Sequence, residues 1–252
     1  MNILISVDSI DHFYFFKKIV SNTNNLNIFY ISNKISLKIF EKKINIIRPS
    51  DKRKMFKEKF KKSKEYSLNL GGRLVSDCYY STREKLIYIN KKNKIDLVFI
   101  WNGNSIIDIA ISDFAYLNKI KVLYFENANI KGKVFVDKLG TNAQSEIFVN
   151  KSHLNNFRLN KDFSSWKKNY LREKLNNHVV PQSTGVKRIN YFYIFDLIGY
   201  LLKISIRNEN YNFYNKLKNK LSSKINSKFQ SIYPLNFDYI FYPMQVASDT
   251  QM

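Results

Sequence analysis

Short, nearly continuous apolar runs alternate with longer amphipathic stretches over the first half of the sequence. Apolar runs of this kind are typical of strands that are buried on both faces of a parallel sheet. We expect strands at 2–7, 26–32, 44–48, 96–101 and 121–126, and helices at 9–22, 34–40, 74–91 and 105–119. The alternation predicts an α/β fold with a Rossmann-like parallel sheet covered on both faces, whose ligand groups lie just past the carboxyl ends of the strands.

The pattern changes after about residue 150. We expect a Rossmann-like lobe at 1–150 and a polar, helical extension at 151–236. Strand character returns in the last stretch, 237–252, where the apolar run Tyr239–Tyr242 is followed by Pro243 and a polar turn. We interpret this stretch as the start of a second lobe that is missing from the chain.

The net charge of +22, from 42 Lys and Arg against 20 Asp and Glu, has two interpretations. It could mark a nucleic-acid binder, or it could reflect an AT-rich genome. Only eight of the 42 basic residues are Arg, which is the usual base-reading residue, and the lysines form one dense block, at 51–64. We therefore expect no nucleic-acid partner. The charge could hold the protein near an anionic membrane surface or substrate, and the block is either a membrane-facing patch or a solvated helix.

Several other classes are excluded by what the sequence lacks. A single cysteine, Cys78, excludes an internal disulfide, and three histidines show no metal-ligand spacing. The longest apolar stretch, 191–204, is short for a membrane span and contains Asp196. The N-terminus does not read as a signal peptide, and there is no P-loop, GxGxxG, HExxH or GxSxG motif. We expect a cytoplasmic protein without a metal or a cofactor.

Two polar clusters follow predicted strands, at 101–105 (WNGNS) and at 126–132. Glu126 could be an acid/base group, or it could cap a helix N-terminus. Trp101 could belong to the core or the wall of a cleft, or it could be a stacking platform. Asn102 and Gly103 read as a tight turn, and Gly140 is predicted to have a positive φ.

The order of these motifs resembles the bacterial capsule polysaccharide synthesis and export family. The shared features are a strand ending in WNG, a strand ending in Glu, and an Asp-x-x-Gly-x-Asn segment followed by Ser. In this sequence they are Trp101–Gly103, Glu126, and Asp137, Gly140, Asn142 and Ser145. The closing PMQVASDTQM also resembles the family, through Pro243, Gln245, Val246, Asp249 and Gln251.

The resemblance implies a two-lobed GT-B-type glycosyltransferase similar to the β-Kdo transferases of capsule assembly. Its donor would be the nucleotide sugar CMP-Kdo, without a cofactor or a metal. Its acceptor would be a lipid-linked or glycan acceptor at the cytoplasmic face of the inner membrane. The protein would then be peripheral on that membrane and would work beside other capsule assembly proteins.

The resemblance also implies roles for particular residues. Asp249 would be the nucleophile of a retaining reaction, although the residue pattern without the resemblance favours a helix N-cap at this position. Glu126 would be the acid/base group or would position the acceptor hydroxyl. The expected substrate-binding residues are Asn102, Gly103, Asn142, Gln245 and Gln251, the last two also fixing Asp249.

A second hypothesis is a non-catalytic module that binds a glycan, a lipid head group or a partner protein. In the family, the second lobe supplies most of the contacts to the nucleotide donor. The chain would be either a fragment of a longer enzyme or a degenerate copy, and we expect that these 252 residues alone would not catalyse transfer. The sequence leaves open whether the chain is an enzyme and whether transfer retains or inverts the anomeric configuration.

Overall fold

The computed structural model describes residues 1–49, 72–128, 133–150, 152, 163–175 and 192–206. The strands are β1 (Asn2–Ser6), β2 (Asn27–Ser32), β3 (Asn45–Ile46), β4 (Leu97–Trp101), β5 (Lys121–Asn127) and β6 (Val134–Asp137). The helices are α1 (Ile10–Ser21), α3 (Gly72–Lys92), α4 (Ile106–Leu117), α5 (Glu146–Val149), α6 (Phe163–Leu175) and α7 (Phe192–Leu201), with short 3₁₀ turns η1 (Ile35–Ile39) and η4 (Asn142–Gln144).

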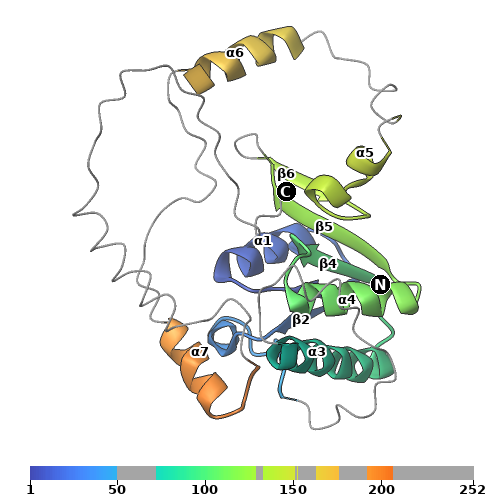
Figure 1. Ribbon diagram of the computed structural model, residues 1–252, viewed down its shortest axis with the longest axis vertical. Coiled ribbons are helices and arrows are strands. Elements are labelled where there is room, and N and C mark those ends of the chain that lie inside the picture. The colour runs from blue at the N-terminus through green and yellow to red at the C-terminus, as the bar shows by residue number, and fades with distance from the viewer. Residues whose placement is uncertain (50–71, 129–132, 151, 153–162, 176–191, 207–252) are drawn as a thin grey trace, which may run out of the picture.

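The six strands form one sheet in the order β3-β2-β1-β4-β5-β6 (Figure 1). Strands β1 to β5 are parallel, and β6 runs antiparallel along the outer edge of β5. This order and direction confirm the predicted Rossmann-like α/β fold. The sheet also has an antiparallel edge strand that the sequence did not predict, because the chain turns back after β5 and pairs Glu126 with Phe135.

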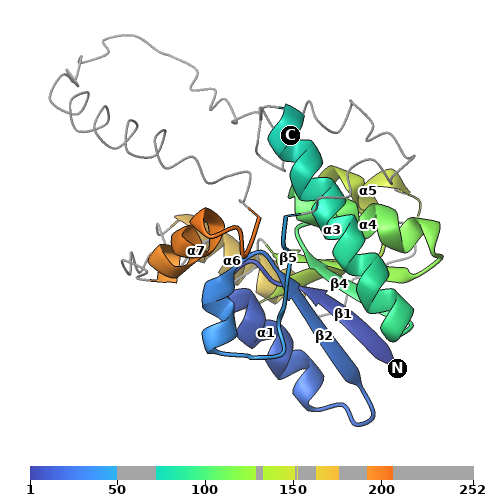
Figure 2. The same ribbon diagram turned by 90° about the horizontal axis from the view of Figure 1, so that it is seen from below.

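Each face of the sheet has its own hydrophobic core. On β1, Leu4 points into the core under α3 and α4, whereas Ile3 and Ile5 point into the core under α1. Strand β4 alternates in the same way, with Val98 on one side and Phe99 on the other, because successive strand residues face opposite sides. Figure 2 shows α1 on one side of the sheet and α3 and α4 on the other.

Helix α7 packs against η1, far from it in the sequence. The Asp196 carboxylate accepts hydrogen bonds from the backbone N–H (2.9 Å) and the hydroxyl (3.0 Å) of Ser36. Just after the helix, the Ile206 N–H donates to the Ile47 carbonyl, and the Ile206 side chain joins the core beneath α3 and α4. The chain segment that ends with Ile206 is therefore fastened to the sheet domain.

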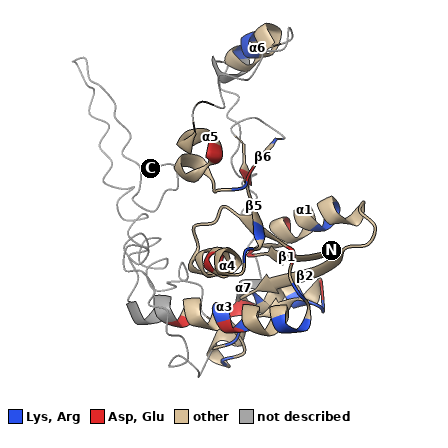
Figure 3. Ribbon diagram, turned by 90° about the vertical axis from the view of Figure 1, so that its right-hand side faces the viewer, with Lys and Arg blue, Asp and Glu red and all other residues tan. Residues whose placement is uncertain are grey.

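None of the helices in the described residues has both the length and the apolar character to cross a membrane. Lys and Arg are spread over several elements in Figure 3. The basic block at 51–64 lies outside the described residues.

Candidate functional site

The middle of the sheet contains a topological switch point. From β1 the chain goes on to β2 at one side, and from β4 it goes on to β5 at the other side. The loop after β1 and the loop after β4 therefore diverge, and helices α1 and α4 begin beside the gap. In open α/β sheets this is the usual place for a ligand, because loops and helix N-termini converge there without covering it.

Both helices begin with a serine cap at this point. The Ser9 hydroxyl accepts a hydrogen bond from the His12 N–H (3.1 Å), and the Ser105 hydroxyl accepts one from the Asp108 N–H (3.1 Å). The caps satisfy one amide each, and the two helix N-termini favour negative charge nearby.

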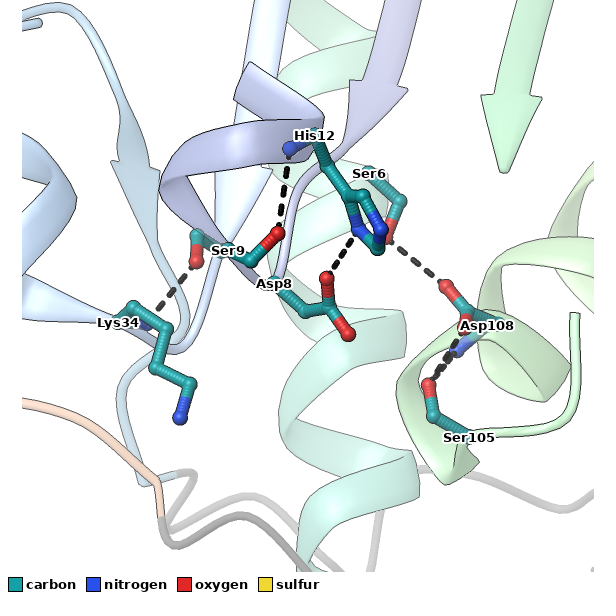
Figure 4. Close-up of polar contacts among 8 residues, drawn as sticks. Ser6, Asp8, Ser9, His12, Lys34, Ser105 and Asp108 are labelled. Carbon is teal, nitrogen blue, oxygen red and sulfur yellow. Dashed lines mark hydrogen bonds and ion pairs between the residues drawn. The ribbon is translucent and has the colours of Figure 1, made fainter. Parts of the chain in front are cut away.

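An aspartate–histidine pair lies at the first of these helices (Figure 4). Nδ1 of His12 is shielded from solvent and faces Oδ1 of Asp8 at 2.5 Å. The Asp8 side chain is 62% exposed, whereas the His12 side chain is only 20% exposed. Desolvation raises the pKa of Asp8, but the hydrogen bond and charge of His12 and the charge of Lys34 outweigh it and hold that pKa below its ordinary value.

The end of β4 holds the imidazole ring. His12 stacks on Trp101 with 4.3 Å between the ring centroids and 24° between the ring planes. Trp101 in turn meets Phe15 and Phe16 of α1 edge-on, at 5.2 and 6.0 Å. Trp101 is half-buried, and its ring is the surface on which the histidine stacks.

A buried carboxyl group lies on the α4 side of the same gap. Asp108 accepts hydrogen bonds from the hydroxyl of Ser6, at the end of β1 (2.9 Å), and from the hydroxyl of Ser105 (2.7 Å). Burial raises the pKa of Asp108 to about 7. The charge of Asp8 raises it further, while the two hydroxyl groups and the charge of His12 oppose the rise. Asp108 therefore holds a proton for much of the time at neutral pH.

The second polar group surrounds the predicted turn after β4. Asn102 and Gly103 both have positive φ, 67° and 88°, which confirms the tight turn. A Cβ on Gly103 would lie 2.9 Å from the Tyr124 ring, so the turn needs glycine for two reasons. The side-chain amide of Asn104 donates to the Asn102 side-chain oxygen at 2.8 Å, so Asn102 braces its own loop.

Hydrogen bonds join three stretches that are separate in the sequence. The Thr141 hydroxyl donates to the Asn102 carbonyl at 2.8 Å. The next residue, Asn142, donates from its side-chain amide to the Glu126 carboxylate at 3.1 Å. Glu126 and Asn142 are both half-buried, so the carboxylate is held in place and still meets solvent.

The loop after β6 is built around a buried aspartate. The Asp137 carboxylate accepts from the backbone N–H groups of Leu139 (2.7 Å), Gly140 (3.2 Å) and Glu146 (3.0 Å). Ser145 caps the short α5 and donates from its hydroxyl to the Asn142 carbonyl at 2.7 Å. These contacts give Asp137 and Ser145 structural roles.

The prediction of a positive φ at Gly140 was wrong. Among the described glycines, only Gly103 has one, and in this loop the positive φ belongs to Asn142, at 50°. Glycine is needed at 140 because a Cβ there would lie 2.7 Å from the Cβ of Gln144. The constraint is the close approach of η4.

Of the predicted site residues, the structure brings together Asn102, Gly103 and Asn142, which follow β4 or β6, and Glu126, which lies in the last part of β5. Asp249, Gln245 and Gln251 lie outside the described residues. In the described part of the chain, no three His, Cys, Asp or Glu side chains are grouped to hold a metal ion.

Sequence reasoning missed the residues at the switch point: Ser6, Asp8, His12 and Asp108. Two local signals could have found them. Ser105 and Asp108 have the serine-x-x-acid spacing of a capping box, and Asp8 directly follows a buried strand. No protein-family model matches the chain, and a search of curated proteins finds no similar sequence.

Proposed function

We propose that the chain forms one lobe of a glycosyltransferase of capsule polysaccharide assembly. In this proposal the two-lobed enzyme transfers Kdo from CMP-Kdo to a lipid-linked acceptor at the cytoplasmic face of the inner membrane. The Rossmann-like sheet supports this proposal, because it is the framework that such a lobe requires. The activity itself is our inference from the resemblance of the motifs.

One observation carries the proposal furthest. The three motifs of the resemblance meet in space: the Thr141 hydroxyl bonds to the WNG turn at Asn102, and Asn142 bonds to Glu126. Asn102 and Thr141 are 39 residues apart in sequence, so local chain geometry does not explain their contact. Joined motifs beside the ends of two parallel strands support a common role in binding or catalysis.

The geometry suggests how the residues divide the work. Glu126, oriented by Asn142, would act as the acid/base group or would position the acceptor hydroxyl. Gly103 permits the turn, and Asn102 would serve through its amide NH₂ group, since its oxygen accepts hydrogen bonds within the loop. The roles proposed for Asp249 as nucleophile and for Gln245 and Gln251 as its supports rest on the sequence resemblance.

The test is an assay of the full chain, as its own cells make it and with any second lobe present, using CMP-Kdo and a short-chain Kdo glycolipid. We expect CMP release that depends on the acceptor. Glu126→Gln should lower the rate by about 10²–10⁴-fold, because it keeps the shape and removes the ionisable group. Glu41→Gln is the matched control, since the Glu41 carboxylate accepts a hydrogen bond from the Lys43 N–H on the exposed surface.

Other outcomes separate the two functional hypotheses. Binding of the glycolipid without CMP release would favour the non-catalytic module. Equal rates for Glu126→Gln and Glu41→Gln would remove Glu126 from the chemistry. No binding of either compound would refute the proposal.

A further inference from the structure

The histidine at the switch point is held more firmly than a surface histidine needs to be. Its Nδ1 faces the Asp8 carboxylate, its ring stacks on Trp101, and its backbone N–H is bonded to the Ser9 cap. These three contacts come from two different strand ends and one helix. Together they restrict both the tilt of the imidazole ring and the choice of the nitrogen that meets Asp8.

The second ring nitrogen is left for another partner. Among the described residues, no hydrogen bond to Nε2 of His12 is formed, and the side chain remains 20% exposed. A carboxylate on Nδ1 favours the tautomer in which Nδ1 carries the hydrogen and Nε2 has the lone pair. Nε2 of His12 is therefore arranged as a proton acceptor.

The surroundings fit a hydroxyl-bearing ligand. The Asp8 carboxylate remains 62% exposed, and on the α4 side the buried Ser6 hydroxyl donates a hydrogen bond to the buried Asp108 carboxyl group. Carboxylate oxygens accept hydrogen bonds from sugar hydroxyl groups. The site therefore combines acceptors for hydroxyl groups with one base.

A purely structural role for the Asp8–His12 contact explains fewer of these observations. Asp8 and His12 are four residues apart, so they could simply be an ion pair at the start of α1. Such a pair needs neither Trp101 from a neighbouring strand nor Nδ1 shielded from water. Its position at the switch point also coincides with the usual ligand position of the fold.

We propose that His12 accepts the proton of the hydroxyl group that attacks the sugar donor, and that Asp8 is its positioning residue. The proposal rests on the proposed function, since it identifies this hydroxyl with that of the acceptor. The proposal places an acceptor-binding subsite at the end of β1 and the start of α1, in addition to the site around Glu126 on β5.

The step balances without a further reactant. The acceptor oxygen forms a bond to the anomeric carbon of the Kdo unit, and the bond from that carbon to its leaving group breaks. The leaving group keeps the bonding electron pair. The hydroxyl proton passes to Nε2 of His12 and is later released to water.

Three variants of the full chain test this, with CMP-Kdo and a short-chain Kdo glycolipid. His12→Gln should lower kcat by about 10²–10⁴-fold with little change in KM for the donor. Asp8→Asn should lower kcat as well, and Asp8→Glu should recover part of it. Asp11→Asn, in the same exposed helix turn, is the matched control and should keep the wild-type rate.

A measurement on the wild-type protein tests the proposal even if the variants fail to fold. Adding the glycolipid should shift the ¹⁵N resonance of His12 Nε2, and an unchanged resonance overturns the proposal. A wild-type rate in His12→Gln, or an equal loss in Asp11→Asn, overturns it and leaves the proposed function standing. No transfer by the wild-type chain overturns both.

Discussion

Replacing the buried Asp108 by asparagine should stabilise the protein at alkaline pH. Asp108 is 8% exposed, and its pKa is raised from 3.8 to about 7 because burial disfavours the charged form. The folded protein therefore binds this proton more tightly than the unfolded chain does. The free energy of unfolding should fall as the pH rises from about 4 to about 7, and should then level off.

The size of the effect follows from the pKa change. Each pKa unit corresponds to about 1.4 kcal/mol, so a rise of about three units costs roughly 4 kcal/mol of stability at pH 8. Asparagine removes this cost, and its amide can still accept from Ser6 and donate toward Ser105. Imperfect geometry of these two bonds would cost about 1 kcal/mol. We expect Asp108→Asn to be more stable than the wild type by about 3 kcal/mol at pH 8.

The assay is urea unfolding of both proteins at pH 5, 6.5 and 8, followed by circular dichroism. The stability difference between variant and wild type should grow with pH over this range. Asp11→Asn, on the exposed first turn of α1, should show a small difference that does not depend on pH. A pH-independent difference for Asp108→Asn would refute the reasoning, because Asp108 would then not take up a proton on folding.

Three further changes probe the packing around the sheet. Gly103→Ala should cost about 1–3 kcal/mol, because φ is 88° and the new Cβ would meet the Tyr124 ring; an unchanged urea midpoint would contradict this. Thr141→Val should cost about 1–2 kcal/mol in the same assay through the lost bond to the Asn102 carbonyl, and Thr141→Ser should not. Phe16→Ala should cost about 3–5 kcal/mol, since Phe16 is fully buried under α1; a loss below 1 kcal/mol by calorimetry would argue against that packing.

The sheet could be predicted because its central strands are buried on both faces. Leu97–Trp101 is apolar throughout, and in an α/β fold a short run of this kind usually forms a strand inside the sheet. Strand β6 was missed because Val134–Asp137 is only four residues long and depends on pairing with β5. Local sequence carries little information about a pairing of that kind.

Of the two parts of the candidate site, the turn after β4 could be predicted from the sequence and the group around His12 could not. The turn at Asn102–Gly103 follows from local chemistry, because both residue types tolerate a positive φ. The His12 group depends on β1 and β4 lying side by side, which places Trp101 against a helix about ninety residues earlier. Sequence patterns within one segment do not contain that neighbourhood, so the histidine was read as an ordinary helix residue.

The mass of the glycolipid after incubation of the full chain with CMP-Kdo tests the central claim most directly. The account predicts that the glycolipid gains the mass of one Kdo unit, and that Glu126→Gln and His12→Gln both prevent the gain. A glycolipid of unchanged mass, with the wild-type chain folded and CMP-Kdo intact, would contradict the account.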